Sequence, residues 1–322
     1  MTVNVILKED SGSTSSRLTT ICLALIVASL PFVSSCSLQK LAVKQTANVL
    51  VDGSVALYRE PDVEFARTAI PANLKTLESL LVSDPENAEL LELMAEGHFS
   101  YAFGFLEHEL AQAQVELAPE DEIEALTERT VGHYMRARDY GFRLLDFPEL
   151  EKAAMKPDVE KVKELLEEVD EDQVAGLFWA GYGWGSAVNL AQQDPNMVAA
   201  LPIVEAIMRR CAELDESYYF SGVHMFFGVY YASRPKMAGG DPEKAKKHFD
   251  IAMEKAGRRN LMIPFLYARF YGAQTQNREL FDKLMGQILE ADFGEHPDTR
   301  LFNELAKERA EFWTDHADEL FY

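Results

Sequence analysis

Apolar residues recur at intervals of three and four from about residue 40 to the C-terminus, and this spacing constrains the fold more than any other feature of the chain. One series consists of Val63, Ala66, Ile70, Leu74, Leu77 and Leu81. A second runs over residues 123–144 and a third over residues 302–320. Residues three and four apart share one face of an α-helix, so each series predicts a helix with an apolar stripe. Alternation of period two is not sustained, and we therefore predict an all-α protein with essentially no sheet.

Asp-Pro steps divide this pattern into short helices. Asp84-Pro85, Asp194-Pro195 and Asp241-Pro242 each place an aspartate that can cap a helix before a proline, which is favoured at the first helical position. About ten to twelve helices joined by short turns can form either a single-domain bundle or a stacked array of helical hairpins.

A repeat-like signature near the C-terminus favours the array. The tetratricopeptide (TPR) pattern has Gly and then Tyr three residues later on its first helix, and Ala, Phe and Ala on its second. The matching residues are Gly228, Tyr231, Ala245, Phe249 and Ala252, with a turn longer than the standard one. We predict a degenerate TPR-like helical-hairpin array that forms a single domain over residues 61–322; the plain bundle is the alternative.

The N-terminus has the features of a bacterial export signal. A polar stretch ending at Arg17 precedes an apolar run that is too short to span a membrane, and Ser34 and Ser35 come directly before Cys36. Small residues before a cysteine resemble a lipobox, in which the cysteine is acylated after cleavage. We predict a signal peptide over residues 1–35, lipidation of Cys36, and an anchor segment with the first helix over 36–60. An ordinary signal with a chance cysteine is the alternative.

Charge and cysteine content limit the possible partners. The chain has 53 acidic and 31 basic residues and a net charge of −22, which disfavours binding to nucleic acid or to anionic lipid headgroups. At most one of the three cysteines lies in the mature body, which excludes a disulfide framework. We interpret that cysteine, Cys211, as a small buried apolar residue.

Motifs of covalent chemistry are missing from the sequence. It contains no HExxH, no paired-histidine metal spacing, no GxSxG and no P-loop. The segment Glu107-His108-Glu109 has no visible catalytic partner, and we interpret it as a solvated helix face. We predict a protein without enzymatic activity, cofactor or metal site.

Two unusual stretches supply candidate ligand-binding residues. The first combines three glycines with four aromatic residues, Phe178, Trp179, Tyr182 and Trp184. Glycine costs a helix up to ~1 kcal/mol relative to alanine, so three glycines so close together need a reason. These aromatic residues could line an apolar cavity, as in many small-molecule sites. A close helix crossing is the structural alternative.

The second stretch is the turn over residues 233–242. It holds Arg234 and Lys236 beside Gly239 and Gly240, immediately before a capped helix. Cations and free amides near a helix N-terminus can hold a carboxylate. The alternative is a plain turn whose glycines adopt positive φ and whose cations balance local acids.

Taken together, these stretches resemble a known family, the T component (TatT) of tripartite ATP-independent periplasmic (TRAP) transporters. The matching segments are residues 69–78, 84–91, 177–179, 184–185, 210–218, 233–245 and 318–322, with Asn303 and Ala306. The resemblance spans nearly the whole mature chain in the right order. It implies an all-α lipoprotein with TPR-like helix pairs and no catalytic residues.

The resemblance also implies a homotrimer and association with the transporter's P-type periplasmic solute-binding protein, to which a small solute would be passed. We expect a periplasmic location, with the lipid anchor as the only membrane contact. Ser37 follows the cysteine where aspartate would suggest retention at the inner membrane, so the inner leaflet of the outer membrane is favoured. The alternative function is a TPR-like outer-membrane lipoprotein that scaffolds envelope assembly.

Overall fold

The structure, a computed structural model, describes residues 39–322. The predicted signal peptide and the lipidation site Cys36 lie outside the described residues. A first helix covers residues 39–58. The helices that follow are α2 (Val63–Leu81), α3 (Ala88–Tyr101), α4 (Glu107–Val115), α5 (Glu120–Leu145), α6 (Pro148–Ala154), α7 (Val159–Leu166), α8 (Val174–Leu190), α9 (Pro195–Ala199), α10 (Leu201–Leu214), α11 (Tyr218–Ala232), α12 (Pro242–Ala256), α13 (Met262–Leu266), α14 (Arg278–Leu289) and α15 (Arg300–Asp315).

The described part of the chain contains no β-strand, which confirms the all-α prediction. The helices slightly outnumber the expected ten to twelve because some, such as α9 and α13, are only five residues long. Two π-helical segments, Ala102–Leu106 and Tyr267–Gly272, continue α3 and α13 without a break. Such π-turns are frequent at functional sites.

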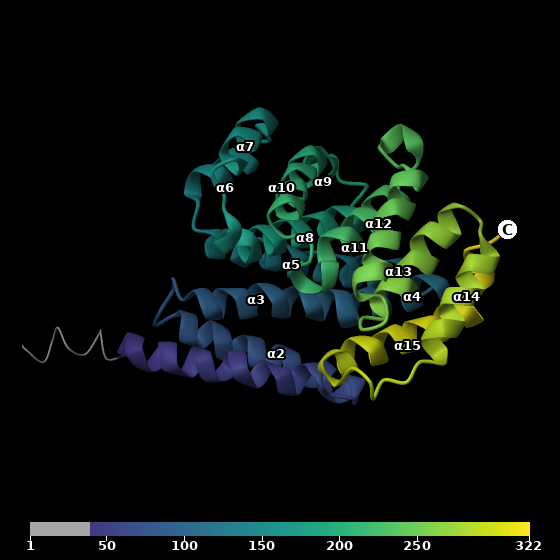
Figure 1. The fold of residues 1–322 in the computed structure, drawn as a ribbon, viewed down its shortest axis with the longest axis horizontal. Coiled ribbons are helices and arrows are strands. Elements are labelled where there is room, and N and C mark those ends of the chain that lie inside the picture. The colour runs from purple at the N-terminus through teal and green to yellow at the C-terminus, as the bar shows by residue number, and fades with distance from the viewer. Residues whose placement is uncertain (1–38) are drawn as a thin grey trace, which may run out of the picture.

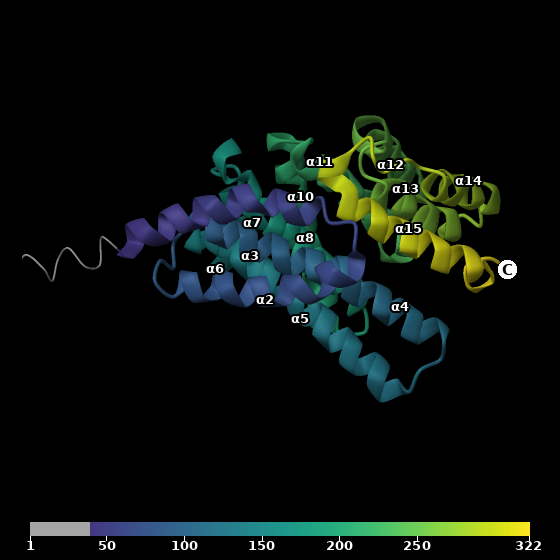
Figure 2. The same ribbon diagram turned by 90° about the horizontal axis from the view of Figure 1, so that it is seen from below.

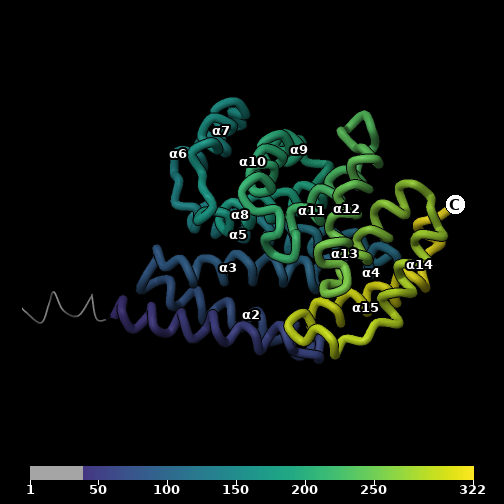
Figure 3. Tube along the Cα trace, in the orientation of Figure 1, coloured from purple at the N-terminus to yellow at the C-terminus, as the bar shows by residue number. Residues whose placement is uncertain are grey.

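The helices form layers around two central helices, α5 and α8. The first helix, α2 and α3 run side by side along the base of the molecule (Figures 1 and 3). Helices α6, α7, α9 and α10 lie on the opposite side of α5 and α8 (Figure 1). Helices α11 to α14 pack beside these layers, with α11 against α8 and α12, and α15 turns back to contact α2. The view in Figure 2 shows α4 and the start of α5 extending away from this body.

Glycines let α5 and α8 approach closely. A Cβ atom built on Gly141 would lie 2.4 Å from the backbone nitrogen of Ala180, and one on Gly183 would lie 2.7 Å from the carbonyl oxygen of Tyr134. Contacts this short are possible only without a side chain, so glycine at these positions sets the distance between the helices. The glycines of α8 therefore match the close-crossing alternative.

The helix pair at the repeat-like signature is also present. Helices α11 and α12 pack together, and a Cβ on Gly228 would lie 2.8 Å from the Phe249 ring, so the glycine accommodates the phenylalanine. The Asp241 carboxylate accepts a hydrogen bond from the Lys244 backbone N–H and caps α12 as expected. The wider TPR-like repeat stays a prediction.

One of the three Asp-Pro caps is misplaced in the sequence-based prediction. The Asp194 side chain caps α9 at the expected position. Asp84-Pro85, however, forms the turn before α3, and the helix is capped by Asn87, whose side chain accepts from the Leu90 N–H. Asparagine caps a helix about as well as aspartate, and because Asn87 and not Asp84 takes this role, the helix begins three residues later than predicted.

A left-handed turn opens α11. Tyr219, Phe220 and Ser221 have φ angles of 48°, 58° and 59°. This conformation costs a residue with a Cβ roughly 1–2 kcal/mol, so other contacts must hold it. The Tyr219 hydroxyl donates to Glu96 at 3.0 Å, and the rings of Tyr219 and Phe220 contact Phe302 with centroid distances of 6.3 and 6.4 Å. The strained turn thus joins α11 to α3 and α15.

Replacing Ser221 with glycine should stabilise the protein by about 1 kcal/mol, because glycine adopts positive φ without a Cβ clash. Ser79→Gly, in the right-handed helix α2, is the control and should cost about 0.5–1 kcal/mol. The measurement is urea denaturation followed by circular dichroism. Equal destabilisation by both variants would show that the left-handed turn does not form in solution.

Candidate functional site

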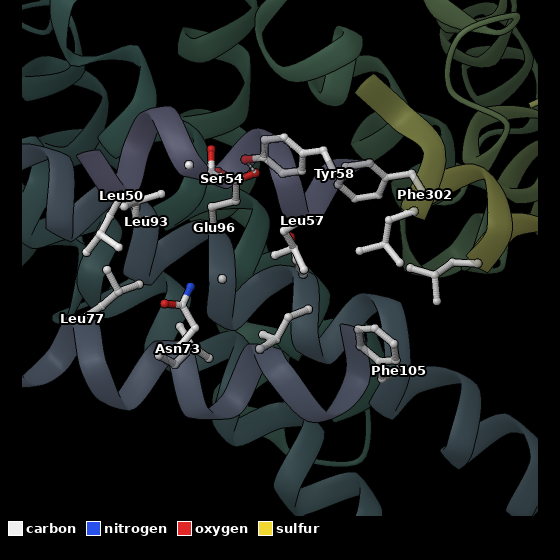
Figure 4. Close-up of a pocket in the computed structure, with 17 residues that line it drawn as sticks. Leu50, Ser54, Leu57, Tyr58, Asn73, Leu77, Leu93, Glu96, Phe105 and Phe302 are labelled. Atoms are coloured by element: carbon white, nitrogen blue, oxygen red, sulfur yellow. Dashed lines mark hydrogen bonds between the residues drawn. The ribbon is translucent and has the colours of Figure 1, made fainter. Parts of the chain in front are cut away.

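An apolar pocket of about 220 Å³ lies between the first helix, α2, α3 and α15 (Figure 4). Its lining is mainly leucine with two aromatic rings. The lining residues are Leu50, Gly53, Ser54, Leu57, Tyr58, Ile70, Asn73, Leu74, Leu77, Leu93, Glu96, Gly97, Ser100, Phe105, Leu301, Phe302 and Leu305. The apolar stripe of α2 forms one wall, and Phe302 from α15 stacks on Tyr58 at one end, with ring centroids 6.1 Å apart.

One carboxyl group, that of Glu96, lies in this apolar pocket. Glu96 and Tyr58 point toward one another in Figure 4, and the Tyr58 hydroxyl donates to Glu96 Oε1 at 2.6 Å. The Tyr219 hydroxyl, from the left-handed turn, donates to the same oxygen at 3.0 Å. A second pair lies one helical turn away, where the Tyr218 hydroxyl donates to Glu92 at 2.9 Å. Five residues from three elements therefore build a hydrogen-bonded group at the side of the pocket.

Burial dominates the ionisation of this group. The pKa of Glu96 is raised because desolvation disfavours its charge, an effect that the nearby Glu92 carboxylate adds to and that the Tyr58 and Tyr219 hydrogen bonds only partly oppose. The pKa values of Tyr58 and Tyr219 are raised as well, chiefly by burial and then by the Glu96 charge. Glu96 keeps some accessible area, and that area faces the pocket that it lines.

The raised pKa makes stability depend on pH with a definite sign. Between the ordinary pKa of a glutamate and the higher one of Glu96, the folded protein holds a proton that the unfolded chain has lost. The free energy of unfolding therefore falls as pH rises above about 4.5. Glu96→Gln keeps the acceptor oxygen and should flatten this decline, whereas Glu254→Gln, at an exposed position, should not. Urea denaturation across pH 4–8 measures the free energy of unfolding. If that free energy changes with pH equally in Glu96→Gln and in the parent protein, Glu96 does not have a raised pKa.

Two of the residues predicted to bind a ligand meet at a second, smaller cavity. Tyr182 and Arg234 line a hollow of about 40 Å³ together with Glu107. Neighbouring hollows of about 390 and 170 Å³ share Asn189 and Phe270 with it. The Arg234 guanidinium is buried, lies 3.9 Å from the centre of the Tyr230 ring, and donates to the Tyr230 carbonyl at 3.1 Å.

The other residues predicted to bind a ligand do not line this second cavity. Phe178 and Trp179 are fully buried among aromatic rings, and Trp184 packs against Phe142. Lys236 and Gly239 are exposed, and Gly239 has φ 88°, as expected for a plain turn. Gly240 is buried, and a Cβ there would meet the Arg234 carbonyl at 1.8 Å. The two halves of the predicted site thus meet only through Tyr182 and Arg234, and a role in ligand binding stays a prediction.

The interpretation of Glu107-His108-Glu109 as a solvated face is wrong for His108, while Glu107 and Glu109 are half-buried. His108 is buried, and neither ring nitrogen has a hydrogen-bond partner within residues 39–322. Burial raises the pKa of Glu107, which the nearby Arg309 charge opposes. Glu109 forms an ion pair with Arg67. His108 is covered by side chains of α15, a segment far away in the sequence: Phe312 lies edge-on to its ring with centroids 5.4 Å apart, and Glu308 lies 3.8 Å from its Nε2. Cys211 is buried, as predicted.

Sequence reasoning missed the pocket around Glu96 altogether. The available signal was weak: a glutamate followed by Gly97 inside an otherwise apolar stretch of α3. Its tyrosine partners come from positions 38 residues before it and 123 residues after it, so the chain order gives no hint of the cluster.

Residues 39–322 contain neither a metal-binding cluster nor a membrane-spanning helix. Within residues 39–322, no three or more His, Cys, Asp or Glu side chains gather as they would to hold a metal ion. Of the helices in this same range, none combines the length and the apolar character that a membrane span requires.

The fold and the pocket define an all-helical protein with a hollow of solute size that contains a single buried carboxyl group. The sequence profile of the TRAP transporter T-component matches residues 59–321, and the chain belongs to this family. A protein of Treponema pallidum (strain Nichols) described as uncharacterized is 23% identical over 307 residues, which are 89% of this chain and 94% of that protein. The family makes the protein an accessory component of a TRAP transporter.

Proposed function

We propose that this T component binds a small, largely apolar solute in the pocket around Glu96 and relays it to or from the transporter's P-type solute-binding protein. The observation that carries the proposal is the pocket itself. Its walls are leucine-rich, its volume of about 220 Å³ suits a small molecule, and its few polar groups are held in place by hydrogen bonds. Sites of this composition are typical of small-molecule binding.

The polar group limits the chemistry of the solute. The Tyr58 and Tyr219 hydroxyls both donate to Oε1 of Glu96, which leaves its other oxygen for a ligand. A solute with an apolar body and one hydrogen-bond donor, such as an amine or an alcohol, satisfies that oxygen. A carboxylate solute is disfavoured because burial in an apolar pocket and the neighbouring carboxyl groups of Glu96 and Glu92 both oppose a further negative charge there.

We further propose that the protein does no covalent chemistry. Burial keeps the tyrosines of the pocket in their neutral forms and raises the pKa of the Cys211 thiol to about 12. Nucleophilic catalysis needs the opposite shift.

The cellular setting is part of the same proposal. The lipobox-like sequence before Cys36 supports a lipoprotein held to the inner leaflet of the outer membrane by its acyl chains alone. The family supports an association with transporter components. Within that association we propose a homotrimer that binds the P-type protein.

Filling the pocket should abolish solute binding without unfolding the protein. Gly53 lines the pocket from the first helix, and a Cβ built there meets no atom within 4 Å. Gly53→Phe should weaken binding of the apolar amine dye phenylnaphthylamine at least about tenfold, or ~1.4 kcal/mol. Stability should be unchanged or higher, because a helical glycine is replaced.

The matched control is Gly286→Phe in α14, where a Cβ also meets nothing within 4 Å and which does not line the pocket. It should leave dye fluorescence and dye affinity unchanged. Equal dye binding by the parent and both variants would place the solute outside this pocket.

The partner is tested by mixing the purified protein with a P-type protein of a TRAP transporter from the same organism and measuring the mass by light scattering. A trimer that gains up to three P subunits supports the transporter role. A lone particle that binds no P subunit would favour the alternative, an envelope scaffold. Repeating the titration with Gly53→Phe separates docking from solute transfer, since filling the pocket should leave docking intact.

A further inference from the structure

A row of cations crosses the groove between α2, α3 and α5. Arg129, His133, Arg136, Tyr140 and Arg143 follow one another on α5 at alternating steps of four and three. This spacing places all five on one face of the helix. They line a hollow of about 540 Å³, more than twice the volume of the apolar pocket.

The three arginines have no carboxylate partner. Of the other charged residues around the hollow, Lys75 pairs with Glu78 at 2.5 Å, and Asp139 pairs with Arg138 at 2.6 Å. In the chain from residue 39 onward, no Asp or Glu oxygen lies within 4.0 Å of the three arginines. A chain with 53 acidic residues could readily have paired them, yet this groove keeps an excess of three positive charges.

Neutral groups hold two of the arginines in position. Arg129 donates to the Tyr101 hydroxyl at 2.8 Å, and Arg143 donates to the Pro85 carbonyl at 2.8 Å while lying over the Tyr140 ring. These contacts fix the side chains without neutralising them and leave most of their N–H groups free. An oxyanion bound there would gain charge-assisted hydrogen bonds, and arginine suits such bonds best.

Two histidines complete the floor of the groove. His98 is buried, and its Nδ1 lies 2.9 Å from Nδ1 of His133. Burial and the charges of His133 and Arg136 lower the pKa of His98 to about 3. Burial and the charges of Arg136 and Arg129 lower the pKa of His133 to about 4. In the neutral pair one ring donates through Nδ1 and the other accepts, so the accepting ring must carry its proton on Nε2. The floor therefore keeps one N–H donor and no negative charge.

We propose that this groove is a second binding site, for a small soluble molecule that carries at least two oxyanion groups, such as a diphosphate or a polycarboxylate. Arg129 and Arg136 are about 10 Å apart along the helix axis, a span that two arginine side chains can close around one such ligand. A bilayer presents the same phosphate chemistry, but a flat anionic surface would also meet the acidic surface of a protein with net charge −22.

The test is isothermal titration calorimetry of the purified protein with pyrophosphate, with orthophosphate as the ligand of lower charge, at low ionic strength. We expect saturable binding of pyrophosphate that is at least about tenfold tighter than that of orthophosphate, because a second oxyanion group adds charge-assisted hydrogen bonds. The Arg136 side chain makes no hydrogen bond or ion pair to another residue within 39–322, so Arg136→Gln should keep the fold, as circular dichroism can verify. It should weaken pyrophosphate binding about tenfold.

Arg258→Gln, at an exposed arginine outside the groove, is the matched control and should change the affinity less than about twofold. Arg143→Gln is a second groove variant and should also weaken binding. The proposal is overturned if millimolar pyrophosphate gives no heat, or if Arg258→Gln weakens binding as much as Arg136→Gln. It is overturned equally if only phosphatidylglycerol vesicles, and not pyrophosphate, bind through the arginines, since the site would then be for lipid. Gly53→Phe should leave pyrophosphate binding intact, so this site can be judged independently of the apolar pocket.

Discussion

Gly141→Ala should lower the free energy of unfolding by about 3 kcal/mol, although it adds a single methyl group. The new Cβ would lie 2.4 Å from the backbone nitrogen of Ala180 and 2.9 Å from its Cα. Backbone atoms cannot rotate away as a side chain can, so α5 and α8 would have to move apart. These two helices form the centre of the molecule, and the loss should appear in urea denaturation followed by circular dichroism.

Gly132→Ala provides the control on the same helix. A Cβ at Gly132 meets no atom within 4 Å, so alanine there should stabilise α5 by up to about 1 kcal/mol through its helix propensity. The two changes are chemically identical and should have opposite signs. If both variants are stabilised, the α5–α8 crossing is wider in solution than the structure shows.

Trp179→Ala should cost about 3–5 kcal/mol, the range for removing a buried aromatic side chain. Trp179 is fully buried, and its ring centroid lies within 5.5 Å of those of Phe178, Phe99 and Tyr219. Helices α3, α8 and α11 meet around this ring, so a cavity left there would loosen three elements at once. Thermal and urea denaturation both report the effect.

Phe65→Ala is the control, since Phe65 is 61% exposed and should contribute less than about 0.5 kcal/mol. Dye titration of Trp179→Ala gives a second measurement. A large loss of dye affinity with little loss of stability would show that Trp179 lines a ligand cavity, as its sequence context suggested, and is not a core residue.

The first helix lines the apolar pocket but lies outside the part of the chain that matches the family. It supplies Leu50, Leu57 and Tyr58 to the apolar pocket, yet it precedes residue 59, where the match to the family begins. It also follows closely after the proposed lipid anchor at Cys36. The wall of the pocket that the first helix forms is therefore the part of the site that the family match does not cover.

The sequence alone determined the class of fold. Apolar spacing of three and four predicted the helices now seen as α2, α5 and α15, because one apolar face per helix is a local property of the chain. The helix caps at Asp194 and Asp241 could also be predicted from the sequence, because a capping side chain and the amide that it binds are only two or three residues apart. Family-specific motifs in the same segments led to the T component.

The sites were decided by tertiary structure. Glu96 becomes part of a site only through its hydrogen bonds to Tyr58 and Tyr219, which belong to two other helices. Tyr219 lies in a left-handed turn that no residue propensity predicts. The same holds for His108, which the sequence pattern places on a solvated helix face but which Phe312 and Glu308 of α15 cover in the folded chain. Helix formation depends on neighbours within one or two turns, whereas burial, pKa and the shape of a pocket depend on what long-range packing brings together, and only the folded chain contains that information.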